Sequence, residues 1–124
     1  MARCAAELID QRAFEYYPRL SRLRSFCIDH LDQQISLRDA ADKASLERTY
    51  FSTYFHHKVG VCFGCWLTSL RIDHAQLLLE SSEVSITEVA AAVGYRSLSG
   101  FERAFRNMTG HSAAGYRKRA RPTH

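Results

Sequence analysis

Glycine and proline are scarce in this chain of 124 residues, which contains six glycines and two prolines. The sequence also has no Asn-Gly or Asp-Gly pair and no sustained alternation of apolar and polar residues, so the usual signals of β-hairpins and half-buried strands are missing. Apolar residues recur instead at steps of three and four. We therefore predict an all-α protein, built as one domain or as two very small domains that share a core.

Long apolar runs are missing as well. No stretch approaches the ~18 apolar residues that a membrane-spanning helix needs. Residues 1–20 mix acidic and basic side chains and lack the apolar core of a signal peptide. We expect no membrane partner and a cytoplasmic location. There, the four cysteines at positions 4, 27, 62 and 65 would be reduced thiols and not a disulfide framework.

Acidic residues are absent from Arg103 to the C-terminus. The net charge is +4, and residues 1–35 contain as many acids as arginines, so the whole excess lies in residues 36–124. The bases that follow Glu102 are Arg103, Arg106, Arg117, Lys118, Arg119 and Arg121. This distribution suits a polyanionic partner. A solvated basic tail is the alternative interpretation.

Motifs for catalysis are missing too. The sequence has no glycine-rich phosphate loop, no nucleophile elbow and no motif of paired carboxylates. We therefore expect neither an enzyme nor a bound cofactor.

Six helices are predicted from apolar spacing and capping signals. The apolar stripe that starts at Leu20 predicts a helix over 19–32. Capping-box sequences at Ser36 and Ser85 predict short helices over about 37–44 and 86–93. The other three helices are predicted over 48–58, over 63–80, and from Ser97 to Gly110.

Two of these helices share one pattern, in FSTYFHHKVG (51–60) and FERAFRNMTG (101–110). Phenylalanines four residues apart lie on one helical face and would anchor it to a core, and the glycine would end the helix. Each segment follows a short helix and a tight turn, which is the helix-turn-helix arrangement. A plain helical hairpin would explain one such unit, but two units joined by a long helix favour a DNA-binding protein. The residues predicted to face outward are Arg48, Thr49, Ser52, Thr53 and His56 in the first unit, and Leu98, Ser99, Glu102, Arg103 and Arg106 in the second.

From about Arg19 to Arg117 the sequence resembles the DNA-binding domain of the AraC/XylS transcription regulators. The matching residues lie mostly in the second unit: Ile86, Ala90, Gly94-Tyr95, Ser99, Phe101, Phe105, Gly110 and Tyr116-Arg117. The resemblance implies about seven helices in two helix-turn-helix subdomains, at 19–62 and 81–117, joined by a central helix at 63–80. Residues 1–18 would be an extension or linker, and residues 118–124 a basic tail.

The resemblance also implies a mode of action. Two recognition helices of one chain would enter successive major grooves on one face of double-stranded DNA, so that a monomer reads an asymmetric site. Members of the family are mostly activators that recruit RNA polymerase, and this makes a sequence-specific transcription activator the implied function. Many members carry a separate effector-binding domain, which residues 1–18 are too few to form.

By positional match, the base-contacting residues would be Thr49, Ser52 and Thr53 in the first recognition helix and Leu98, Ser99, Glu102 and Arg103 in the second. The DNA backbone would be contacted by Arg48, Lys58, Arg96 and Arg106. Arg103 is the predicted guanine contact, because its forked guanidinium matches guanine O6 and N7. Leu98 would pack on a thymine methyl group. Glu102 would either accept from cytosine or orient Arg103.

The first unit departs from the family pattern at its turn. Glu47 occupies the N-cap position of the recognition helix, where the family usually has serine. We expect this glutamate to cap poorly and to repel a nearby phosphate. Ser45 stands where a turn glycine is common.

A cluster in HHKVGVCFGC supports a different class of function. His56, His57, Cys62 and Cys65 are residue types that bind zinc or undergo redox chemistry. In the family alignment, however, the two cysteines open the central helix and His56 faces outward, so we interpret them as small residues at a helix start and predict no metal. A metal- or redox-responsive helical interaction module that uses these four residues is the alternative hypothesis.

Overall fold

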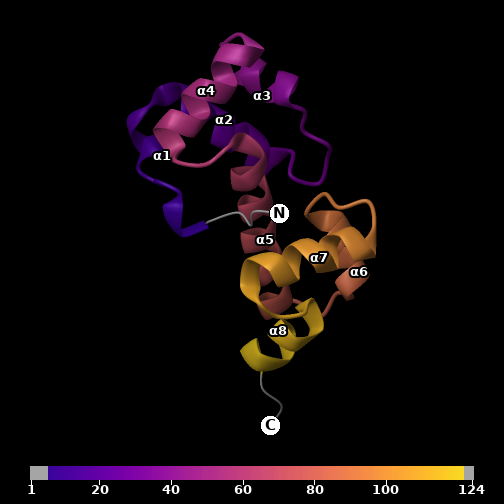
Figure 1. Cartoon of the computed structure of the whole chain (residues 1–124). Coiled ribbons are helices and arrows are strands. Elements are labelled where there is room, and N and C mark those ends of the chain that lie inside the picture. Colours follow the sequence, from indigo (N-terminus) through magenta and orange to yellow (C-terminus); the bar gives the residue numbers. More distant parts are fainter. Residues whose placement is uncertain (1–5, 122–124) are drawn as a thin grey trace. The chain divides into compact units, whose positions relative to one another are not determined.

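The computed structural model describes residues 6–121, which contain eight α-helices, one short 3-10 helix and no strand (Figure 1). The all-α prediction is confirmed. The elements are η1 (Ala6–Leu8), α1 (Ala13–Tyr16), α2 (Pro18–Asp29), α3 (Leu37–Lys43), α4 (Arg48–Val59), α5 (Phe63–Ser81), α6 (Ile86–Ala92), α7 (Leu98–Thr109) and α8 (Ala113–Ala120). No helix among these residues combines the length and the apolar character that crossing a bilayer requires.

The chain divides into two compact units. In the part that the structure describes, the N-terminal unit comprises residues 6–67 and the C-terminal unit residues 68–121. Helix α5 contributes its first residues to the former and the rest to the latter. Each unit contains a short helix, a turn and a longer helix, α3–α4 in one and α6–α7 in the other.

Aromatic rings form the core of the N-terminal unit. The Phe14 ring stacks on Trp66, with 4.9 Å between centroids, and meets Phe55 edge-on at 6.1 Å. Phe51 and Phe63 extend this cluster, with their centroids 5.7 Å apart. The sequence predicts residues 1–18 as an extension, but Phe14 of α1 is completely buried in this core. A helix of four residues is too short to show an apolar period, so its contribution is not visible in the sequence.

The core of the C-terminal unit is smaller and contains fewer rings. Phe101 and Phe105 are both fully buried and lie 5.6 Å apart. Tyr95 packs edge-on against Phe101, and Tyr116 packs edge-on against Phe105. These contacts hold the turn before α7 and the helix after it against the same pair of rings.

Helix α8 changes the interpretation of the basic C-terminus, because two of the six bases that follow Glu102 bind the C-terminal end of α5. Arg117 Nε donates to the Leu79 carbonyl at 3.2 Å, and Arg121 donates to the Ser82 carbonyl at 2.6 Å and pairs with Glu83. The Tyr116 hydroxyl also donates to Glu80, which raises the pKa of Tyr116 to about 12. Residues 118–120 therefore belong to α8, with Lys118 and Arg119 exposed, whereas Arg121 is bound to the end of α5. The guanidinium groups of Arg117 and Arg121 anchor α8 at a helix C-terminus, where positive charge is favourable.

The turns of the two helix-turn-helix units have the same backbone geometry. The Leu46 amide donates to the Ala41 carbonyl, and the Tyr95 amide donates to the Ala90 carbonyl, both at 2.9 Å. This is the hydrogen bond of a Schellman motif, which needs a left-handed residue just before the donor. In the second turn that residue is Gly94, with φ of 97°, but in the first it is Ser45, with φ of 60°.

We expect Ser45→Gly to raise the free energy of unfolding by about 0.5–1 kcal/mol. A left-handed L-residue costs roughly 1–2 kcal/mol, of which the greater chain entropy of glycine offsets a part. Urea denaturation followed by circular dichroism measures the change. The reverse substitution in the other unit, Gly94→Ala, should destabilise the protein. A Ser45→Gly protein less stable than wild type would contradict the strain assigned to this turn.

Candidate nucleic-acid interface

The first recognition helix, α4, begins with a cap that differs from the prediction. The carboxylate of Glu47 accepts from the Tyr50 amide at 3.0 Å, so this residue does cap the helix, and the expectation that it would cap poorly is wrong. Its side chain is long enough to fold back over the first turn. The hydrogen bonds from the Tyr50 and Thr49 amides lower the pKa of Glu47. Because the folded-state pKa is lowered, the cap stabilises the fold above the ordinary pKa of glutamate and is lost as pH falls through the lowered value.

The two faces of α4 are those that the Phe pattern predicts. Phe51 and Phe55 are completely buried, and Gly60 ends the helix in the left-handed conformation. Of the residues predicted to face outward, Ser52 is half-buried and the others are exposed: Arg48, Thr49, Thr53 and His56. The helix therefore presents short hydroxyl side chains and one arginine along its outer face.

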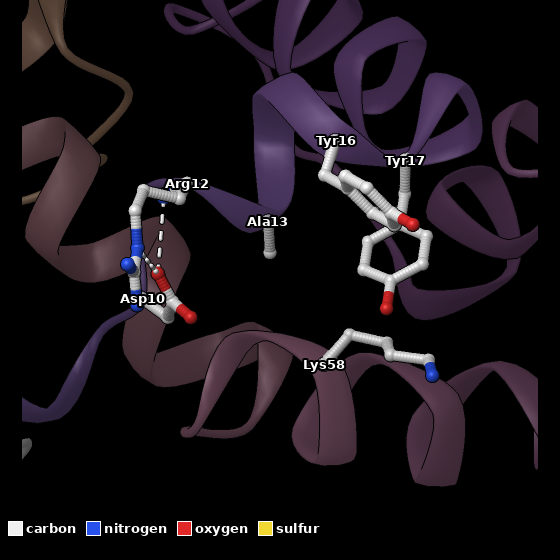
Figure 2. A pocket seen from close by; sticks show the side chains of 6 residues that line it. All are labelled: Asp10, Arg12, Ala13, Tyr16, Tyr17 and Lys58. Atoms are coloured by element: carbon white, nitrogen blue, oxygen red, sulfur yellow. Dashed lines mark hydrogen bonds and ion pairs between the residues drawn. The ribbon is translucent and has the colours of Figure 1, made fainter.

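Lys58, a predicted backbone contact, lies at the other end of α4 beside a group of tyrosines. Its ammonium group is 5.0 Å from the centroid of Tyr17 and 5.9 Å from that of Tyr54. Lys58 lines a pocket of about 300 Å³. Figure 2 shows Lys58 on one side of it and Tyr16 and Tyr17 on the other. Both rings lie within cation–π distance of the ammonium group and so help to fix its position.

The second recognition helix, α7, has the same construction. Ser97 caps it by accepting from the Gly100 amide at 3.1 Å, and Gly110 ends it with φ of 80°. The exposed residues among those predicted to contact DNA are Leu98, Ser99, Arg103 and Arg106 on the helix and Arg96 just before it. Leu98 is a large apolar side chain that is 42% exposed at the start of the helix, as a contact to a methyl group would require.

Glu102 differs from the other predicted base contacts. Its carboxylate accepts from the Ala113 amide at 3.3 Å, and Ala113 is the first residue of α8. The side chain is half-buried and turned toward the neighbouring helix. The two roles predicted for Glu102 are a cytosine contact and the orientation of Arg103, and neither involves α8. The periodicity of α7 alone cannot show that the first residue of α8 lies beside Glu102.

We expect Glu102→Ala to lower the free energy of unfolding by about 0.5–1.5 kcal/mol, the usual loss for one hydrogen bond. Glu102→Gln keeps an acceptor oxygen and should retain most of that stability. Neither variant should alter the preferred DNA sequence. If Glu102→Ala relaxed the preference at one base pair and left stability unchanged, Glu102 would be a base contact after all.

The protein-family model described as a helix-turn-helix domain matches residues 40–119, which include both turns and both recognition helices. The chain belongs to the AraC family of DNA-binding transcription regulators. The melibiose operon regulatory protein of Escherichia coli K12 is 29% identical over 99 residues, which are 80% of this chain and 33% of that protein. An uncharacterized helix-turn-helix regulator of Staphylococcus aureus (strain COL) is 30% identical over 88 residues, 71% of this chain and 12% of the relative. The chain thus spans a third or less of the length of these relatives.

Solved structures show the same fold. The DNA-binding domain of AdpA, in complex with a target DNA, is 32% identical and superposes with a TM-score of 0.78 over 86% of this chain and 98% of its own. The C-terminal domain of AraT, a response regulator from Geobacillus stearothermophilus, is 31% identical, with a TM-score of 0.77 over 82% of this chain and 85% of its own. The first comes from a global transcriptional factor and the second from a response regulator.

Two arginines outside the predicted DNA contacts support the turns of this AraC-family chain. Arg19 of α2 donates to the Ala44 carbonyl at 2.8 Å, and Arg71 of α5 donates to the Val93 carbonyl at 2.6 Å. Ala44 and Val93 are the C-cap residues of α3 and α6, the first helix of each helix-turn-helix. A guanidinium at this position donates to a carbonyl that has no partner within the helix, and its positive charge interacts favourably with the negative end of the helix dipole. The repeat therefore includes the helix that precedes each unit. The two arginines lie 52 positions apart and not fifty, so the spacing of the repeat does not pair them in the sequence.

The residues of the alternative hypothesis do not assemble a metal site. In the described part of the chain, no group of three or more histidine, cysteine, aspartate or glutamate side chains has the arrangement that holds a metal ion. The Cys62 sulfur accepts from the Cys65 amide at 3.4 Å, so Cys62 caps the start of α5. The two cysteines thus open the central helix, as the family resemblance implies.

Proposed function

We propose that this chain reads an asymmetric double-stranded DNA site as a monomer, by inserting α4 and α7 into successive major grooves. The observation that carries the proposal is the repetition of one construction: a capped helix with two buried phenylalanines on one side and polar side chains on the other. A recognition helix in a major groove needs both faces, since one holds it to its domain and the other contacts base edges. The AdpA domain in complex with a target DNA supports the same partner.

The proposed contacts are the exposed residues among those predicted, together with the half-buried Ser52 and Lys58. Bases are contacted by Thr49, Ser52 and Thr53 from α4 and by Leu98, Ser99 and Arg103 from α7. Phosphates are contacted by Arg48, Lys58, Arg96 and Arg106. Glu102 is assigned to the support of α8, because its carboxylate is engaged there. Activation of transcription through RNA polymerase stays a prediction from the family, as does the cytoplasmic location.

Selection of preferred sites from random DNA by the full chain tests this proposal. We expect two conserved segments separated by about one helical turn, or 34–36 Å, because one face of the duplex presents successive major grooves at that spacing. Titration at physiological salt should then give one chain per site and tighter binding than to scrambled DNA. Equal affinity for selected and scrambled DNA would overturn the function, and a single conserved segment would overturn the use of two helices.

A further inference from the structure

The residue that caps the helix after each repeated segment differs between the two units: it is Cys62 in the first and Ser112 in the second. Position 62 corresponds to position 112, with the same offset of fifty that relates Phe51 to Phe101. Ser112 caps α8 by accepting from the Gly115 amide at 3.0 Å, and Cys62 makes the equivalent contact to the Cys65 amide at 3.4 Å. Sulfur is a weak acceptor and serine a preferred cap, so capping strength does not explain a cysteine here.

The Cys62 sulfur lies against the backbone amide of the second cysteine, Cys65. The carbonyl of Cys62 accepts the first bond of α5, from the Trp66 amide at 3.1 Å, which places Cys62 at the N-cap and Cys65 three residues further. In helical geometry, residues three apart have Cα atoms about 5 Å apart. A disulfide spans Cα separations of about 4.4–6.8 Å, so the backbone does not have to move far to accept one.

Exposure separates this pair from the other described cysteine. Cys62 is exposed and Cys65 half-buried, whereas Cys27 is completely buried in the core. A reagent dissolved in water reaches Cys62 first, and Cys65 is the thiol next to it. A zinc ion would need further ligands, and the described residues do not supply a group of three around this position.

We propose that Cys62 and Cys65 are a dithiol that is oxidised reversibly to an intramolecular disulfide by low-molecular-weight disulfides such as oxidised glutathione. The Cys62 sulfur attacks the glutathione disulfide, and the first glutathione leaves as a thiol. The Cys65 sulfur then attacks the Cys62 sulfur of the mixed disulfide, and the second glutathione leaves. Two electrons and two protons pass from the protein thiols to the glutathione pair, so the reaction balances without a further reactant.

Peptide mapping of the full chain tests the proposal, in a background with Cys4→Ser. After oxidised glutathione and alkylation, trypsin cuts behind Lys58 and Arg71 and releases residues 59–71, which contain both cysteines. We expect this peptide to lose two hydrogens and both alkylation sites, and to regain them with dithiothreitol. Cys27, on residues 25–38, should remain a thiol and so report that the fold is intact.

Two variants separate the steps. Cys65→Ser should accumulate the mixed disulfide of Cys62 with glutathione, because the thiol that resolves it is missing. Cys62→Ser should form neither product, and its hydroxyl keeps the cap as in Ser112. Three outcomes would overturn the proposal: two unmodified thiols on residues 59–71 under excess oxidant, a mixed disulfide that persists in the parent protein, or a disulfide between two chains. None of these measurements depends on DNA binding.

Discussion

Replacing Phe55 by alanine should lower the free energy of unfolding by about 3–5 kcal/mol, the usual cost of deleting a buried phenylalanine side chain. The ring is completely buried, and four other rings surround it at centroid distances of 5.5–6.1 Å. They come from α1, α4 and α5, so no single helix can move to fill the cavity. Urea denaturation monitored by circular dichroism gives the change directly.

His57→Ala is the matched control, because His57 lies on the same helix and is exposed. It should change stability by no more than about 0.5 kcal/mol. The comparison distinguishes loss of packing from loss of helix propensity, since both variants place alanine in α4. Similar losses in the two variants would contradict the core assigned to the N-terminal unit.

Replacing Arg103 by alanine should weaken binding to the selected DNA site by about 1–3 kcal/mol and relax the preference at one position. The residue is exposed on α7, and no acid follows it in the sequence to neutralise it. Its forked guanidinium can meet guanine O6 and N7 together, which no monodentate cation reproduces. Fluorescence anisotropy with a set of single-base variants of the site measures both the affinity and the preference.

Arg106→Ala separates base reading from charge. Arg106 is exposed on the same helix, and its loss should weaken binding to all sequences by a similar factor. Arg103→Lys adds a second comparison, because it keeps the charge and removes the fork. Equal losses for Arg103→Ala on selected and random DNA would show that Arg103 contacts a phosphate and not a base.

The sequence predicts most helices because their ends carry local signals. Both capping boxes are present, with Ser36 and Ser85 accepting from the third residue of each helix, and Gly60 and Gly110 end the recognition helices as expected. Such signals involve only neighbouring residues and can therefore be read directly. The pairing of Phe51 with Phe55 and of Phe101 with Phe105 is local in the same sense.

What could not be predicted depends on contacts between distant segments. The place of Phe14 in the core and the bonds of Arg19 and Arg71 join residues far apart in the chain. Glu102 at the candidate interface is a further case, because its carboxylate accepts a hydrogen bond from Ala113 of α8, which is eleven residues away in the sequence. The prediction that Glu47 caps poorly is wrong for a different reason: propensity ranks describe average behaviour, and this glutamate folds back over the helix start.

The arginines that hold the fold also set how strongly salt should affect DNA binding. Four guanidiniums, those of Arg19, Arg71, Arg117 and Arg121, donate to main-chain carbonyls. A cation engaged inside its own protein displaces no counterion from a phosphate. If only the four proposed phosphate contacts do so, log K should fall with log salt concentration at a slope of about −3.6, since each B-DNA phosphate contributes roughly −0.9. A chain with 17 lysines and arginines would then bind DNA with the salt sensitivity of a much less basic one.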